Sequence, residues 1–285
     1  MPQPLLAVDA PSALFRAFYA LPDTITDNKG QPVNALLGAL NIIFRVVADY
    51  HPRAVVLTFG PDAAEYRTEL YPPYHAQRPE VPPDLERQFG ESREFYEAFG
   101  WTIARSDDHE ADEVLHSLAQ AEQEAGGSVL LLTGDRDMYQ CASDRTLVLY
   151  MKTGTKGVEE VTPDEVKRRY GVTPGQVPDF IALRGDPSDG LPGGKGIGEK
   201  TAADLLSRHG TLEDALDNWS RETSARVRGA LKDQRDELLS FKDIATLRTV
   251  PVKRPADRET DIAGGAELAV ERGMNQLARR LGTPS

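Results

Sequence analysis

Short runs of apolar residues alternate along this chain with longer segments in which apolar residues recur at helical spacing. The runs predict buried strands because they are short and continuous. They are LLAVDA (5–10), AVVLTF (54–59), WTIA (101–104) and SVLLLT (128–133). The longer segments predict helices at Ser12–Leu21, with Ser12 as N-cap, at Asn34–Asp49 and from Glu110 to about Ala125. Parallel strands need crossover helices, so this order indicates an α/β fold with a doubly wound, mostly parallel sheet.

Acidic residues follow several of these predicted strands, and a further acidic string, RGDPSDG, lies later in the chain. They are Asp9, Glu110, Asp112, Glu113, Asp135, Asp137, Asp186 and Asp189. Open parallel sheets bind ligands at the carboxyl ends of their strands, so we expect these acids to meet in one crevice. Clustered carboxylates repel unless cations lie between them, and hard ions such as Mg²⁺ or Mn²⁺ prefer oxygen ligands. Any single acid has an ordinary alternative role in a turn or at a helix N-terminus. The joint pattern predicts a metal-dependent hydrolase.

Composition narrows the class of protein. With 285 residues and 40% hydrophobic content, the chain can bury a large core, as one domain or as a main domain with a smaller one. Cys141 is the single cysteine, which excludes an internal disulfide framework. No apolar stretch is long enough to span a bilayer, so we expect a cytoplasmic protein without membrane contact. The net charge of −12 disfavours nonspecific coating of DNA, so nucleic acid must contact local basic patches.

A proline-rich segment interrupts the strand and helix rhythm at residues 65–83, EYRTELYPPYHAQRPEVPP. Its prolines exclude one regular long helix. Arg67 and Arg78 lie among Tyr66, Tyr71 and Tyr74, a mixture that suits single-stranded nucleic acid, because guanidinium groups pair with phosphates and rings stack on bases. The alternative is a surface loop whose tyrosines cover the core.

A glycine-rich segment, GGKGIGEKTAADLLSRHG, occupies residues 193–210. Glycines at positions 194, 196 and 198 let the backbone approach a ligand, and residues 199–207 predict a helix whose first amides are free to bind phosphate. The segment lacks the spacing of a P-loop and does not follow a strand. Lys195, Lys200 and Arg208 add positive charge, so we expect contact with a duplex backbone.

Taken in order, AVDA, LFRAFYALP, YPPYHAQRP, HEADE, TGDRD, ALRGDPSDG and GIGEKTAADLL resemble the 5′ nuclease family over almost the entire chain. That family includes flap endonucleases and the N-terminal 5′–3′ exonuclease domain of bacterial DNA polymerase I. The resemblance implies a PIN-like nuclease core at 1–172, with an arch at about 62–99. It also implies a helical DNA-binding part at 173–285, with a helix-three-turn-helix motif at about 186–210 that often holds K⁺. No polymerase segment follows, so we expect a stand-alone bacterial relative.

The resemblance also implies roles for particular residues. It makes the eight acids ligands of two Mg²⁺ or Mn²⁺ ions. One ion is assigned to Asp135, Asp137, Asp186 and Asp189, and the other to Asp9, Glu110, Asp112 and Glu113. The predicted catalytic residues are Asp9, Arg16, His75 and Arg78. The predicted DNA contacts are Arg67, Tyr71, Tyr74, Arg78, Lys195, Gly196, Ile197, Gly198, Lys200 and Thr201.

This chain departs from the family pattern at three positions. Glu113 stands where bacterial members usually have Asp, and Gly60 stands where the family has an Asp after the second strand. Asp62 is a candidate substitute for that missing acid. His75 replaces a lysine of the arch, and an imidazole carries less charge at neutral pH, so transition-state charge would be less well stabilised.

The expected function is a structure-specific 5′–3′ exonuclease or flap endonuclease that uses two metal ions on DNA with a 5′ flap or junction. The default oligomeric state is a monomer, because coiled-coil heptads do not appear. Two alternatives stay open: a catalytically weak or inactive DNA-structure-binding protein, and a PIN-type ribonuclease.

Overall fold

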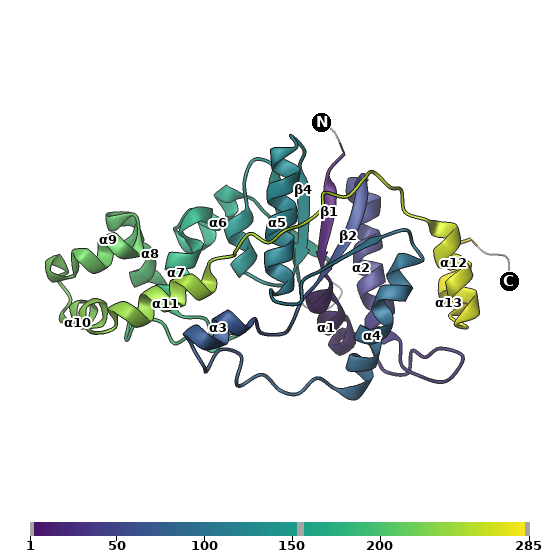
Figure 1. Cartoon of the computed structure of the whole chain (residues 1–285), viewed down its shortest axis with the longest axis horizontal. Helices are drawn as coiled ribbons and strands as arrows, with labels where there is room; N and C mark the ends of the chain where they lie inside the picture. Colours follow the sequence, from purple (N-terminus) through teal and green to yellow (C-terminus); the bar gives the residue numbers. More distant parts are fainter. Residues whose placement is uncertain (1–2, 153–156, 283–285) are drawn as a thin grey trace.

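The computed structural model describes residues 3–152 and 157–282 and centres on a six-stranded sheet (Figure 1). The strand order is β3-β2-β1-β4-β5-β6. The strands are β1 (Leu5–Asp9), β2 (Ala54–Phe59), β3 (Thr102–Arg105), β4 (Val129–Thr133), β5 (Thr146–Met151) and β6 (Val158–Val161). Strands β1 to β5 pair in parallel, and β6 pairs antiparallel with β5. Because β1 lies between β2 and β4, the ends of these strands meet at one edge of the sheet.

Helices cover both faces of the sheet, and alternate residues of each strand pack against the helices on opposite faces. On β1, Leu6 and Val8 belong to a cluster with α1 (Ala10–Ala20), α2 (Asn34–Tyr50) and α4 (Pro83–Glu97). Leu5 and Ala7 face the opposite way, toward α5 (Ala111–Glu124) and the later helices. The continuous apolar runs are therefore buried on both faces, which confirms the doubly wound sheet predicted from sequence.

A group of later helices extends from one side of the sheet (Figure 1). Its members are α6 (Pro163–Tyr170), α7 (Val177–Arg184), α8 (Glu199–His209), α9 (Leu212–Asp217), α10 (Ala225–Asp233) and α11 (Arg235–Ala245). Phe180, Leu205 and Phe241 from these helices belong to the same hydrophobic cluster as Leu5 and Ala7. The helical group is thus packed on the core as one continuous body.

The last two helices do not join that group. After α11 the chain runs back across the sheet, where Arg258 N donates to Arg53 O and Asp261 N donates to Phe99 O, both at 2.8 Å. Helices α12 (Ile262–Glu271) and α13 (Asn275–Arg280) then pack beside α4, and Ala269 and Leu277 join the cluster of α1 and α2. The return segment thus carries the end of the chain to the other side of the sheet, away from α6–α11 (Figure 1). One helical DNA-binding part over 173–285 stays a prediction.

The proline-rich segment connects β2 to α4 along the outside of the molecule (Figure 1). It begins with the short helix α3 (Glu65–Leu70), and between residues 71 and 82 the structure has neither helix nor strand. The Tyr71 ring packs edge-on against Phe241 at 5.1 Å, and His75 N donates to Asp189 O at 3.2 Å. The segment therefore lies against α11 and the loop that follows α7. None of the described helices combines the length and the apolar composition that crossing a membrane requires.

Candidate active site at the carboxyl edge of the sheet

Asp9 is the last residue of β1 and also the N-cap of α1. Its Oδ1 accepts a hydrogen bond from Ser12 N at 3.0 Å, and its Oδ2 accepts one from Thr133 Oγ1 at 2.7 Å. The prediction that Ser12 caps this helix is wrong, because the helix begins earlier, at Ala10. Ser12 instead accepts a bond from Gly134 N at 3.1 Å and so ties the end of β4 to α1. Asp9 is thereby fixed beside the end of β4.

Asp135 and Asp137 follow β4 in a tight turn built on the same threonine. Asp135 N donates to Thr133 Oγ1, and Asp137 N donates to Asp135 Oδ1, both at 2.9 Å. The short helix Asp137–Cys141 then begins. The turn aligns both carboxylates beside Asp9, as the position of the acids after a strand predicted.

Glu110 and Glu113 begin α5 as a capping box, in which each side chain accepts the backbone N–H of the other. Arg67 Nη1 donates to Glu110 Oε2 at 2.7 Å, Tyr74 Oη donates to the same oxygen at 3.1 Å, and Tyr66 Oη donates to Glu113 Oε1 at 2.6 Å. We call these five residues the Arg67 cluster. Burial raises the pKa of Glu110, and the Arg67 charge opposes that rise.

These contacts bear on three predicted site residues. The Glu113 side chain is fully buried and its oxygens accept bonds from Tyr66 and from Glu110 N, so it acts as a helix cap in this conformation. Arg67 and Tyr74 are 5% and 3% exposed, so their side chains do not offer a surface to DNA. The physical reason is that buried carboxylates require donors, and the proline-rich segment supplies them.

Asp112 lies between these two glutamates in sequence but has a different environment. Among the described residues it receives no hydrogen bond. Burial raises the pKa of Asp112 well above its usual range, and the nearby charges of Asp135, Asp9 and Glu110 raise it further. Asp112 therefore faces the acids of β1 and β4 without a compensating donor.

Asp186 and Asp189 come from the loop after α7, where Asp186 pairs with Leu191 in a short antiparallel bridge. Asp186 Oδ1 accepts Ser188 N at 2.8 Å, and its Oδ2 accepts Arg184 Nη2 at 3.2 Å. Asp189 Oδ1 accepts Arg78 Nη2 at 3.2 Å. The loop thus brings acids of the helical group to the edge of the sheet.

Six aspartates form one group, because the charges of its members raise the pKa of Asp112, Asp135 and Asp137. We call this group the acid cluster: Asp9, Asp112, Asp135, Asp137, Asp186 and Asp189. Burial, and next the Asp189 charge, raise the pKa of Asp135 to about 7. Burial together with Asp135 and Asp189 raises the pKa of Asp137 well above its usual range. Burial is the largest cause of each rise, and the neighbouring acidic charges add to it for Asp112, Asp135 and Asp137.

The acid cluster fits divalent cations by chemistry. All its donors are carboxylate oxygens, the atoms that Mg²⁺ and Mn²⁺ prefer, and their repulsion is what a bound cation would relieve. In the described part of the chain, no three Asp, Glu, His or Cys side chains are already arranged to hold an ion. Ion binding at this edge therefore requires the carboxylates to draw closer together.

Gly60 allows the start of α5 to pack directly on the end of β2. A Cβ atom at Gly60 would lie 2.3 Å from His109 O and 2.8 Å from Ala111 N. An aspartate at this position would collide with that backbone, so the missing family acid reflects a closer contact between β2 and α5. Asp62 does not replace it, because its exposed carboxylate accepts a bond from Arg78 Nη1 at 2.9 Å outside the acid cluster.

His75 and Arg78, two of the predicted catalytic residues, lie beside Asp189 at the rim of the acid cluster. The His75 ring stacks on Tyr74 with centroids 3.8 Å apart, and its Nδ1 donates to Asp62 O at 2.7 Å. Its Nε2 lies 3.1 Å from Asp189 Oδ1. His75 has a φ of +56°, so neighbouring contacts hold it in a strained left-handed conformation. Both side chains bring positive or proton-donating groups to Asp189.

Arg16 reaches the same edge from α1. Its Nη2 donates to Gly134 O at 2.8 Å, in the turn that carries Asp135. Burial raises the pKa of Asp9, and the Arg16 charge opposes that rise. A Cβ at Gly134 would lie 2.0 Å from Arg16 Nε, so glycine leaves room for this guanidinium.

The glycine-rich segment forms an exposed hairpin between α7 and α8. Lys195, Gly196, Gly198 and Lys200 are exposed, and both lysines lack an ion pair among the described residues. Thr201 is half-buried, and the Ile197 side chain is buried, so Ile197 offers only its backbone to a ligand.

Other residues of this region differ from the sequence-based prediction. The Arg208 guanidinium is held by Asp204 and by the buried Glu222, at 2.9 and 2.6 Å, so its charge is already paired. Arg226 is exposed and lies against Gly196, which comes 30 positions earlier in the sequence. Arg226 is not among the predicted DNA contacts. No local motif marks it.

Comparison with known protein families divides the chain in two. A family described as 5′-3′ exonuclease, N-terminal resolvase-like domain, matches residues 4–171, and one described as 5′-3′ exonuclease, C-terminal SAM fold, matches residues 172–261. Helices α12 and α13 lie beyond both matches.

Individual relatives agree with this result. DNA polymerase I of Bacillus subtilis (strain 168) is 32% identical over 290 residues, which cover 99% of this chain and 32% of the relative. The thermostable DNA polymerase I of Thermus thermophilus is 37% identical over 278 residues, covering 97% and 32%. The chain thus spans about 32% of the length of these relatives.

Solved structures share the fold at low identity. Bacteriophage T5 5′-exonuclease with bound zinc has a TM-score of 0.68 at 17% identity and covers 97% of both chains. The catalytic core of Rad2 in complex with DNA substrate has a TM-score of 0.64 at 14% identity, covering 98% of this chain and 93% of Rad2.

Proposed function

The chain belongs to the 5′-3′ exonuclease family, and from this premise we propose that it is a divalent-metal-dependent nuclease that cleaves DNA phosphodiesters near single-strand/duplex junctions. The observation that carries the proposal is the convergence of acids from β1, β4, α5 and the loop after α7 beside Arg16 and Arg78. In replication and repair, such an enzyme would act on a 5′ flap.

The acid cluster would hold two Mg²⁺ or Mn²⁺ ions. When bound, such ions lower the pKa of a water and stabilise the departing oxygen. We assign their binding to Asp9, Asp112, Asp135, Asp137, Asp186 and Asp189, with Glu110 held ready by Arg67. The chain's own cations have a separate role, because Arg16 and Arg78 lie where they can orient a phosphate and balance charge that develops on it.

DNA contact is proposed at the hairpin between α7 and α8. Lys195, Lys200 and Arg226 carry exposed positive charge without an ion pair among the described residues. The amides of Lys195 and Ile197 are already bonded, so phosphate contact is proposed through these side chains and through the amides of Gly196 and Gly198. Tyr71 is proposed as a contact at the arch. K⁺ binding here, a monomeric state, a cytoplasmic location and the division of the chain at 172/173 stay predictions.

The proposal is tested by incubating the protein with 5′-flapped DNA, blunt duplex and RNA in Mg²⁺ or Mn²⁺. We expect cleavage of the flapped DNA, and Asp135→Asn should abolish it while DNA binding is retained. Asp144→Asn is the matched control and should cleave normally, because Asp144 is exposed, precedes β5 at the opposite edge of the sheet and has no hydrogen bond among the described residues. Unchanged turnover in Asp135→Asn would contradict the assignment. Binding without product would favour a DNA-structure-binding protein, and cleavage of RNA alone a ribonuclease.

A further inference from the structure

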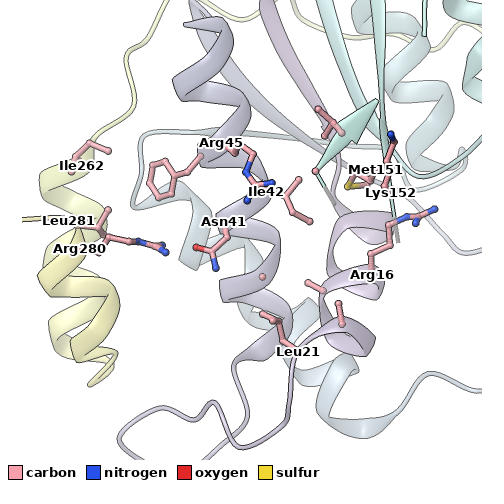
Figure 2. Close-up of a pocket in the computed structure, with 16 residues that line it drawn as sticks. Arg16, Leu21, Asn41, Ile42, Arg45, Met151, Lys152, Ile262, Arg280 and Leu281 are labelled. Carbon is pink, nitrogen blue, oxygen red and sulfur yellow. The ribbon is translucent and has the colours of Figure 1, made fainter. Parts of the chain in front are cut away.

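A large cavity, whose lining includes none of the acid-cluster residues, lies between α1, α2, the end of β5, the start of β6 and the last two helices (Figure 2). Its volume is about 690 Å³, within the range of sites that bind organic ligands or peptide side chains. Helices α12 and α13, which form one wall, belong to the segment beyond residue 261. The cavity is therefore built in part by a region that the family matches do not include.

The wall of the cavity is largely aliphatic. Leu21, Ile42, Met151, Val158 and Leu281 line it, and Ile262 at its rim is 41% exposed. Exposed, concave apolar surface of this kind often marks an interaction site, because covering it with a partner is favourable by about 25 cal/mol of free energy per Å² of apolar area.

The charged residues around the cavity are all positive. Arg16, Arg45, Lys152 and Arg280 line it, and no Asp or Glu does so among the described residues. Lys152 lies 3.8 Å from Glu159, but Arg45 and Arg280 have no ion pair in the described part of the chain. Figure 2 shows Arg280 extending from α13 toward α2, from which Asn41, Ile42 and Arg45 project. In a chain of net charge −12, this is a local site for an anionic partner.

The lining favours a peptide over a nucleic acid. Single-stranded DNA is held by rings that stack on bases, but Phe44 is the one aromatic residue among those that line the cavity. Its ring already packs edge-on against Phe99 and Trp101, at 5.3 and 5.6 Å. Aliphatic walls flanked by arginines instead match bulky apolar side chains interspersed with carboxylates.

We propose that this cavity is a docking site for an acidic segment of a partner protein, which inserts bulky apolar side chains between α2 and α12–α13 and places its carboxylates on Arg45 and Arg280. Arg16 lines the cavity as well as the proposed active site, but its guanidinium is held at Gly134 O. Arg45 and Arg280 lie outside the acid cluster, so variants at these two residues separate partner binding from DNA cleavage. Docking there would bring the nuclease to the partner without blocking the proposed active site.

The test uses the full chain and a short fluorescein-labelled peptide in which aspartates alternate with leucine and phenylalanine. Fluorescence anisotropy should show saturable binding that weakens as salt rises. The double variant Arg45→Glu/Arg280→Glu should weaken binding at least about tenfold, because both residues are exposed and their reversal repels the carboxylates. Replacing the apolar residues of the peptide with alanine should weaken it by a similar factor.

Arg93→Glu is the matched control, because it also reverses the charge of an exposed arginine, but Arg93 lies on α4 and does not line the cavity. It should leave peptide binding within about twofold, and both variants should cleave flapped DNA as the wild type does. The proposal is overturned if the peptide does not saturate, or if the double variant binds it normally. It is also overturned if a labelled single-stranded oligonucleotide occupies the cavity with the same dependence on Arg45 and Arg280, or if the double variant loses cleavage.

Discussion

Two neighbouring regions at the carboxyl edge of the sheet treat their acids in opposite ways. In the Arg67 cluster, Glu110 and Glu113 accept hydrogen bonds from Arg67, Tyr66 and Tyr74. In the acid cluster, the Asp112 side chain comes from the same turn of α5 but accepts no hydrogen bond from the described residues, and burial and then its acidic neighbours raise its pKa. The difference shows that donors from the proline-rich segment neutralise Glu110 and Glu113, whereas the Asp112 carboxylate keeps oxygens that a cation can bind.

Breaking the Arg67 cluster should have the largest effect on stability. Arg67→Met removes the donor to Glu110 and leaves a buried carboxylate without its ion pair, which typically costs about 3–5 kcal/mol. Urea denaturation monitored by circular dichroism measures the free energy of unfolding. Arg93→Met, which removes an exposed pair with Glu97, should cost less than about 1 kcal/mol. Equal losses in the two variants would refute the structural role of the Arg67 cluster.

Asp112→Asn should separate function from stability. Cleavage of flapped DNA should fall at least about 100-fold, because the proposed metal site loses an unpaired oxygen donor. In EDTA the same variant should melt at a higher temperature than the wild type, since a repelling carboxyl is gone. Glu113→Gln provides the contrast: it should lower the melting temperature and leave the Mn²⁺ concentration for half-maximal cleavage nearly unchanged. The reverse pattern would place the ligand at Glu113.

A smaller effect is expected at the contact between β2 and α5. Gly60→Ala should destabilise the protein by about 1–3 kcal/mol, because the added methyl group meets backbone atoms of residues 109–111 that cannot rotate away. Gly90→Ala, in open space on α4, should instead stabilise by up to about 1 kcal/mol through helix propensity. Thermal unfolding of both variants checks the sign of each change, and a neutral Gly60→Ala would contradict the close packing.

Much of the fold follows from local sequence signals. The apolar runs that predict β1, β2 and β4 are short and buried on both faces, and acids lie at the ends of β1 and β4, so these strands and acids could be placed. Strands β5 and β6 are not among the predicted elements; β6 is a short edge strand whose sequence, VEEV, carries little apolar signal. The position of α12 and α13 depends on long-range contacts such as Asp261 N to Phe99 O, which sequence periodicity does not encode.

The sequence predicts which acids belong to the candidate site, but it does not predict which of them form hydrogen bonds or ion pairs with other side chains. A strand end or a string such as TGDRD indicates a carboxylate near the crevice, and the structure brings Asp9, Asp135 and Asp189 together. Whether a carboxylate is paired depends on distant donors: Arg67 reaches Glu110 across 43 positions. For the same reason, the burial of Arg67 and Tyr74, which looked like DNA contacts among prolines, could not be read from composition.

The central claim is tested most directly by isothermal titration of the metal-free protein with Mn²⁺ at pH 6 and pH 8. The carboxyl of Asp135, with its pKa raised to about 7, keeps its proton at the lower pH and has lost it at the higher, so bound ions compete with that proton. We predict saturable binding that is tighter at pH 8, releases protons at pH 6, and is lost in Asp135→Asn. Absence of binding at pH 8, or equal affinity in Asp135→Asn, would contradict a cation site in the acid cluster.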